Sequence, residues 1–215
     1  MRFFILLCLL VGCSGYRFTQ QQNPLAQYGI HSLSIPMFYN YSNLPEVSAD
    51  FTRETYKLLS GFSGLKLKNG YHNSTDAVLI GIVHTQEKTA RMTMLPGSLR
   101  AAQQVAPGSV GATRQQFYVP GSIVIGAELQ IIVIKKPSEE DLALLRSGIG
   151  SLVKSNSKVV FNERIPLQGS YTREFLDKAG TQVVGTQNAG VQRKTIKVMA
   201  EQAAISVRDM ILYAF

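Results

Sequence analysis

A long run of alternating apolar residues, 118–136, constrains the fold more than any other part of this chain. A period of two is typical of a β-strand, because successive side chains point to opposite faces of a sheet. This run is the strongest β signal in the sequence, so it predicts a long strand in the sheet. One set of alternate positions, which we expect to share a face, holds Ile123, Ile125, Ala127, Leu129, Ile131 and Val133.

Four further segments predict strands. Residues 158–167 carry apolar side chains on one face and are the expected partner of the long strand. Residues 30–37 alternate like a half-buried strand, and 65–68 form a short one. Residues 76–83 are almost continuously apolar, as in a central strand covered on both faces. Gly81 inside that strand indicates a bulge or a close approach of another group to the backbone.

The helices are predicted from apolar positions three and four residues apart. Ser48 is a suitable N-cap for a helix over 49–62, and 191–213 is an amphipathic helix. A helical insertion is expected over 137–157, between two strands. We expect a turn at 38–45, a long loop at 88–113 and irregular chain at 168–190. The predicted fold class is therefore α/β (α+β). It is a two-layer sandwich of two main helices on one face of a mixed four-stranded sheet, with the insertion in its last hairpin.

The N-terminus has the pattern of a bacterial lipoprotein signal. Arg2 precedes an apolar run from Phe3 to Val11, which is too short for a spanning helix, and Gly12 precedes Cys13. We expect cleavage before Cys13 and acylation of that residue, with a plain secretory peptide or a short anchor as the alternative. The expected organisation is a signal peptide at 1–12, a lipidated tether at 13–29 and one domain at 30–215. Ser14 favours the outer membrane over the inner one.

The cysteine count and the net charge limit the chemistry and the ligands that we expect. Cys8 leaves with the signal and Cys13 carries lipid, so we expect no disulfide, cysteine metal site or cysteine nucleophile in the mature fold. The net charge of +8 favours an anionic partner. A phosphorylated lipid is the more plausible partner for an exported, tethered protein, and no nucleic acid is expected. The alternative is a merely basic surface.

No catalytic or cofactor motif stands out. The three histidines, His31, His72 and His84, lack metal-ligand spacing, and neither a Gly-x-Ser-x-Gly elbow nor a phosphate-binding glycine loop occurs. We therefore expect no enzyme activity, no metal and no cofactor. The candidate anion-binding residues are basic ones near strand ends and in the long loop, where each could equally be a solvated side chain: Lys135, Lys136, Arg91 and Arg114.

Several segments, in order, resemble the LPS-assembly lipoprotein LptE family. Cys13 is followed by Gly15, Tyr16, Arg17 and Phe18, near the family's Cys-Gly-aromatic start. Residues 33–42 resemble the family strand that ends in Ile-Pro-x-Phe. Residues 76–83 resemble its Val-Leu-x-Gly-x-Ile strand, and the Ser170-Tyr171 segment and the Ala-rich last helix also fit. The resemblance covers most of 13–87 and, more loosely, 117–215. The insertion and the long loop depart from the family pattern.

The resemblance implies an outer-membrane lipoprotein on the periplasmic side or inside the β-barrel of an LptD-type partner. Such a protein plugs the barrel, helps it fold and binds lipopolysaccharide (LPS) during its delivery. Two other interpretations remain: an accessory or pilot lipoprotein of another outer-membrane secretion pore, and a periplasmic hydrolase. The predicted central strand can also be tested by mutation. Ile80→Asp would bury an unpaired carboxylate there, so we expect it to lower the free energy of unfolding by several kcal/mol.

Overall fold

The computed structural model describes residues 22–96, 116–146, 158–173 and 184–213, and side chains for 22–85, 121–143, 158–173 and 185–213. At its centre is the antiparallel hairpin of β4 (Ala77–Pro96) and β5 (Gln116–Lys135), with β6 (Val159–Thr172) antiparallel to β5. The long alternating strand is therefore confirmed. Its side chains at 123, 125, 127, 129, 131 and 133 are all buried on one face.

Three short strands complete one mixed sheet. They are β1 (Ser32–Ile35), β2 (Tyr39–Tyr41) and β3 (Lys66–Asn69), and all three pair in parallel. The order is β3-β1-β4-β5-β6, with β2 also on β4. The sheet thus has six strands rather than the expected four. The segment expected as a turn contains β2, because three residues of parallel pairing to β4 are too short to show a period.

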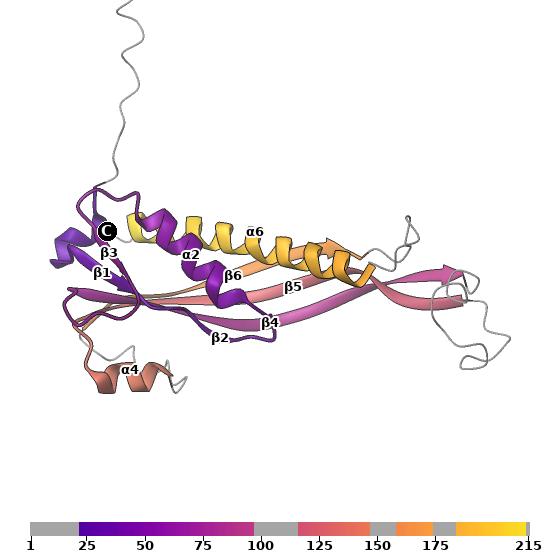
Figure 1. Cartoon of the computed structure of the whole chain (residues 1–215), viewed down its shortest axis with the longest axis horizontal. Coiled ribbons are helices and arrows are strands. Elements are labelled where there is room, and N and C mark those ends of the chain that lie inside the picture. Colours follow the sequence, from indigo (N-terminus) through magenta and orange to yellow (C-terminus); the bar gives the residue numbers. More distant parts are fainter. Residues whose placement is uncertain (1–21, 97–115, 147–157, 174–183, 214–215) are drawn as a thin grey trace, which may run out of the picture.

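Two helices cover one face of the sheet: α2 (Val47–Leu59) and α6 (Val184–Tyr213). Figure 1 shows them side by side above the sheet, with α4 (Glu139–Arg146) below it. Val47, Phe51, Thr55 and Leu59 recur every four residues and form the buried stripe of α2. The buried face of α6 includes small residues that let the helix lie close to its neighbours: Ala200, Ala203 and Ala204. The α+β sandwich class is confirmed.

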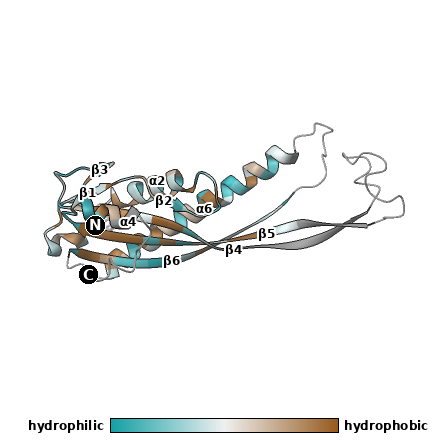
Figure 2. Ribbon diagram, turned by 90° about the horizontal axis from the view of Figure 1, so that it is seen from below, coloured by the Kyte–Doolittle hydropathy of each residue, from teal (hydrophilic) through white to brown (hydrophobic). Residues whose placement is uncertain are grey.

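The helix α4 covers one end of the sheet on the face opposite α2 and α6. Leu142 packs with Ile80, Ile82, Ile132 and Ile134 in a cluster separate from the main core. The predicted central strand is indeed buried on both faces there, since Leu79 and Val83 belong to the main core. The hydrophobic colouring of the long strands is concentrated where helices cover them (Figure 2). Of the predicted insertion, 147–157 lies outside the described residues.

Three element boundaries differ from expectation. The predicted loop at 88–113 is wrong over 88–96, because β4 continues to Pro96 and pairs with β5 there; the rest lies outside the described residues. Pro96 and Gly97 favoured a loop there, although Ala90, Met92 and Met94 alternate with polar residues. Of residues 168–190, expected to be irregular, 168–172 end β6 and 184–190 begin α6, and 174–183 lies outside the described residues. Ser48 does not cap α2; the N-cap is Glu46, with φ 59° and no side-chain cap bond.

The chain before β1 also folds. A 3₁₀ helix, η1 (Pro24–Tyr28), buries Leu25 in the core, and the Asn23 side chain donates to the Ile30 carbonyl at 2.7 Å. Residues 22–29, expected in the tether, therefore belong to the folded part, because one apolar side chain anchors the polar segment. Among the described helices, none is long and apolar enough to cross a membrane.

Candidate anion-binding cleft

Of the four basic residues predicted from sequence, the structure describes the backbone of three, and these lie at two separate places along the sheet. Lys135 and Lys136 are exposed at the end of β5, where Lys135 pairs with Ala77 of β4. Arg91 lies fourteen residues further along β4, opposite Ser122. At 3.3 Å per residue its backbone is about 45 Å from that end. Arg114 lies outside the described residues, as does the predicted lipidation residue Cys13.

The two strand-end lysines have structural contacts of their own. The Nζ atom of Lys135 donates to the Tyr28 carbonyl at 2.6 Å, which holds η1 against the sheet. Lys136 has φ 38°, and its backbone N–H donates to the Asp76 carbonyl at 3.1 Å. These contacts give both residues a role in ending the strand. They leave the Lys136 ammonium exposed. Lys158 lies at the same end, where its carbonyl accepts from the Lys135 N–H at 2.9 Å and its ammonium pairs with Asp141 at 3.0 Å.

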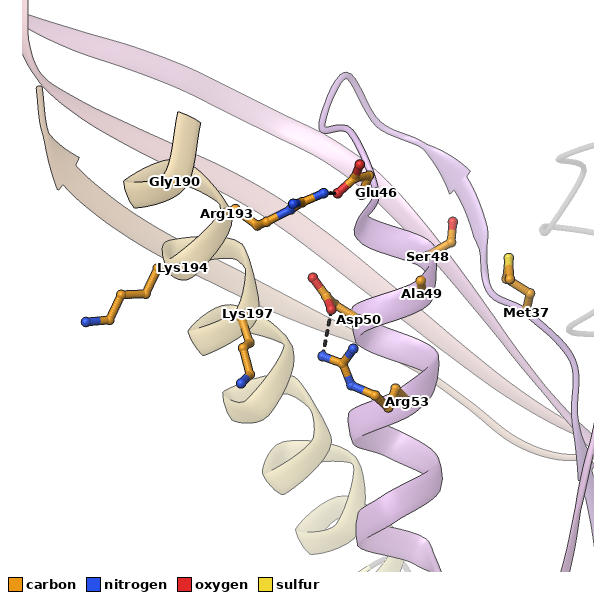
Figure 3. Close-up of a pocket in the computed structure, with 10 residues that line it drawn as sticks. All are labelled: Met37, Glu46, Ser48, Ala49, Asp50, Arg53, Gly190, Arg193, Lys194 and Lys197. Carbon is orange, nitrogen blue, oxygen red and sulfur yellow. Dashed lines mark hydrogen bonds and ion pairs between the residues drawn. The ribbon is translucent and has the colours of Figure 1, made fainter. Parts of the chain in front are cut away.

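A basic cleft lies elsewhere, between the first turns of α2 and the N-terminal half of α6 (Figure 3). Its volume is about 890 Å³. The helices supply four cations and two carboxylates, a net +2 from +4 and −2. The lining residues are Met37, Glu46, Ser48, Ala49, Asp50, Arg53, Gly190, Arg193, Lys194 and Lys197. The positive charge of the cleft comes from α6, which supplies three of the four cations, whereas α2 supplies Arg53 and both carboxylates.

Ion pairs hold two of the four cations. Arg193 of α6 pairs with Glu46 across the mouth of the cleft, as Figure 3 shows. Arg53 pairs with Asp50 at 2.7 Å and with Glu54 at 3.2 Å, both on its own helix. The hydrogen bond to Glu54, assisted by the charge of Asp50, raises the pKa of Arg53 above its ordinary value. Both guanidinium groups are thus held in place and stay charged.

The other two cations are available to a ligand. Lys197 extends between the two helices, whereas Lys194 extends on the β6 side of α6 (Figure 3). Neither ammonium group has a carboxylate partner among the described residues. The N-terminus of α2 opens on the same cleft, and its dipole adds positive potential. The arrangement suits an anionic group such as phosphate, which accepts hydrogen bonds from Lys and Arg.

The described part of the chain offers no metal site or histidine-based site. No group of three His, Cys, Asp or Glu side chains there could hold a metal ion. His72 contacts the Asn69 carbonyl at 2.9 Å, and His84 stacks on Tyr41 with ring centroids 5.9 Å apart. None of the histidines lines the cleft.

Sequence reasoning missed this cleft. Residues 191–213 were predicted only as an amphipathic helix, and none of Arg53, Arg193 or Lys197 was a candidate. Arg53 and Arg193 are separated by 140 positions and meet only because α2 and α6 pack together. The usable signal was the excess of basic over acidic side chains on the exposed face of the last helix.

The comparisons with known proteins are remote. No protein-family model matches the chain, and no curated protein matches it. Among solved structures, rare lipoprotein B of Shewanella oneidensis aligns with 12% identity and a TM-score of 0.33, covering 84% of this chain and 92% of that one. A minor lipoprotein of Acinetobacter baumannii aligns with 14% identity and a TM-score of 0.32, covering 83% and 93%.

A protein of Caulobacter crescentus aligns with 10% identity and a TM-score of 0.37, covering 82% of this chain and 89% of that one. TM-scores below 0.5 do not establish a shared fold, and identities this low do not establish a shared function. The similarity of this chain to the three proteins is therefore limited to these remote alignments.

Proposed function

We propose that this chain is a lipid-anchored protein of the bacterial outer membrane that binds LPS during its delivery, together with an LptD-type β-barrel. The observation that carries the proposal is the basic cleft between α2 and α6, where Lys197 extends between the helices and has no carboxylate partner among the described residues. The phosphates of LPS are anions that such a cleft binds. The lipoprotein signal before Cys13 and the ordered resemblance to the LptE family support the same function.

The proposed role is binding and assembly rather than catalysis. The cleft supplies fixed guanidinium groups and mobile ammonium groups, which hold a phosphorylated headgroup without breaking a bond in it. Arg193 spans the cleft through its ion pair with Glu46, Arg53 is oriented by Asp50 on its own helix, and Lys197 supplies charge between the helices. The acyl anchor at Cys13 keeps the cleft at the membrane from which the glycolipid is taken.

Binding of LPS to the full-length lipidated protein in detergent tests this function. We expect the wild-type protein to bind LPS more tightly than the same LPS with its phosphates removed. The double variant Arg193→Gln/Lys197→Gln loses about tenfold or more in affinity, because each lost charge-assisted hydrogen bond contributes on the order of 1 kcal/mol. The matched control Lys135→Gln/Lys136→Gln removes two positive charges from the strand end and keeps the affinity.

Two results contradict the proposal. Equal binding of phosphorylated and dephosphorylated LPS excludes phosphate recognition. A loss confined to the strand-end variant moves the site from the cleft to the end of β5. The partner is tested by isolating the full-length protein from solubilised outer membranes: a large β-barrel with bound LPS is expected. Recovery of a secretin-like pore instead assigns the chain to another secretion system.

A further inference from the structure

Helix α6 has a second apolar stripe that the fold does not use. Val191, Val198 and Ile205 are 37%, 43% and 46% exposed, although the opposite face of the helix is buried. They are seven residues apart, which is close to two helical turns, so they follow one line along the helix. Stripes with this period pack against another helix.

The stripe borders the free edge of the sheet. A groove of about 380 Å³ runs between α6 and β6, lined by Val191 and Val198 from the helix and Ser170 from the strand. In the described sheet β6 is the last strand, so the backbone on its outer side has no neighbouring strand. Such an edge is a template for further strand pairing. Pro166 has no N–H group to donate to an added strand, whereas the segment after it, 167–172, contains no proline.

The charges beside the stripe match a second copy of the same surface. Lys194 and Glu201 are both exposed and lie on either side of Val198 along the helix. If two α6 helices run antiparallel with Val198 at the centre, each Lys194 comes beside the partner's Glu201. Val191 then faces the partner's Ile205. The attraction therefore occurs twice, as a two-fold symmetric interface requires.

The strand edge fits the same symmetry axis. A Cβ atom at Gly169 would lie 2.7 Å from Cγ2 of Thr195 and 2.6 Å from Sδ of Met199, so Gly169 is at the level of Val198. An axis beside Val198 therefore also passes close to Gly169, the middle of the free segment 167–172. We propose that two copies of this chain pair through α6 and this segment, with antiparallel helices and antiparallel β6 strands. The dimer joins two sheets into one and covers both apolar stripes.

Charge reversal in the full-length lipidated protein tests the pairing. Light scattering in detergent measures the fraction of dimer as a function of protein concentration. We expect Lys194→Glu and Glu201→Lys each to raise the dissociation constant about tenfold or more, because each turns two attractions into repulsions. The double variant Lys194→Glu/Glu201→Lys restores the pairing, since the opposite charges meet again.

Disulfide formation gives a second readout. Val198→Cys places two thiols at the axis and forms a dimer on mild oxidation, whereas Lys197→Cys, one residue away, points toward α2 and does not. Equal cross-linking of the two variants overturns the proposal. A wild-type protein that is monomeric at every concentration also overturns the proposal. So does hydrogen exchange in which the β6 amides are protected only when the β-barrel partner is present, because that partner and not a second copy would then cover the strand edge.

Discussion

The close contact between Gly81 and Phe38 makes a quantitative prediction. A Cβ atom at position 81 would lie 2.3, 2.4 and 2.5 Å from three ring carbons of Phe38, where carbon atoms normally stay 3.5–4.0 Å apart. Phe38 is buried, and its backbone N–H donates to Oγ1 of Thr52 at 2.9 Å. That hydroxyl in turn donates to the Ser48 carbonyl at 2.6 Å. The ring is thus fixed to α2 near its own backbone and cannot move aside cheaply.

Gly81→Ala is therefore expected to lower the free energy of unfolding. Overpacking a well-filled site costs about 1–3 kcal/mol, and the stiffer unfolded chain of alanine returns about 0.5–1 kcal/mol. We expect a net loss of about 1–2 kcal/mol, with the cost in the upper half of its range because the contacted atoms include the Cγ atom at the base of the ring. The measurement is urea denaturation followed by circular dichroism, with a lower midpoint and an unchanged slope.

Two variants check the reason for this loss. Gly185→Ala lies in α6, where nothing is within 4 Å of the added atom, so it is expected to stabilise the protein. The gain is about 0.5–1 kcal/mol, the helix preference of alanine over glycine. Gly81→Ala combined with Phe38→Leu is expected to cost less than the sum of the single changes, since the smaller side chain makes room. A loss below about 0.5 kcal/mol for Gly81→Ala, or strict additivity in the pair, refutes the steric account.

Three more predictions concern other parts of the molecule. Ile80→Asp places a carboxylate at a position that is 1% exposed, so it should cost several kcal/mol in urea denaturation, and a loss under about 1 kcal/mol contradicts the burial. Asp76 accepts hydrogen bonds from the Ser32 hydroxyl and the backbone N–H groups of His31 and Ser32, which lower its pKa. Its contribution is present above its ordinary pKa of about 4 and is lost as the pH falls through the lowered value, so in urea denaturation Asp76→Asn should destabilise at pH 7 and progressively less as the pH falls below about 4. Glu46→Gln leaves Arg193 without its carboxylate and should raise the affinity of the cleft for LPS severalfold in a binding titration; a weaker complex contradicts this electrostatic account.

The sequence predicted the elements that have a strong period. The alternation from Ile123 to Val133 identified the long strand, and Gly81 within an apolar run indicated the close approach that Phe38 makes. Both signals are local, because a buried strand needs apolar residues every second position whatever its neighbours are. The helical stripe in α2 was predicted for the same reason.

Elements with short or interrupted patterns were missed. At the end of β4, Ala90, Met92 and Met94 alternate with Arg91 and Thr93, but Pro96 and Gly97 directly after them favoured a loop. The three residues of β2 are too few to show a pattern. The first turns of α6 contain Gly185 and Gly190, which read as helix breakers in isolation.

The candidate site shows the same limit more sharply. Lys135 and Lys136 were chosen because they end a strand, which is a local feature. The cleft requires knowing that α2 and α6 are neighbours, and no feature within either helix states it. Arg53 and Lys197 therefore became candidates only through the packing of the fold.

Photo-cross-linking from within the cleft tests the central claim most directly. Ala49 is exposed and lines the cleft, so a photoreactive residue there, in the full-length lipidated protein, is expected to cross-link to LPS in living cells. The matched position is Ser60, also exposed but at the other end of α2, about 16 Å along the helix, where no cross-link is expected. Adducts at position 49 alone support the cleft as the LPS site. Adducts at position 60 but not at 49, or at neither position, contradict it.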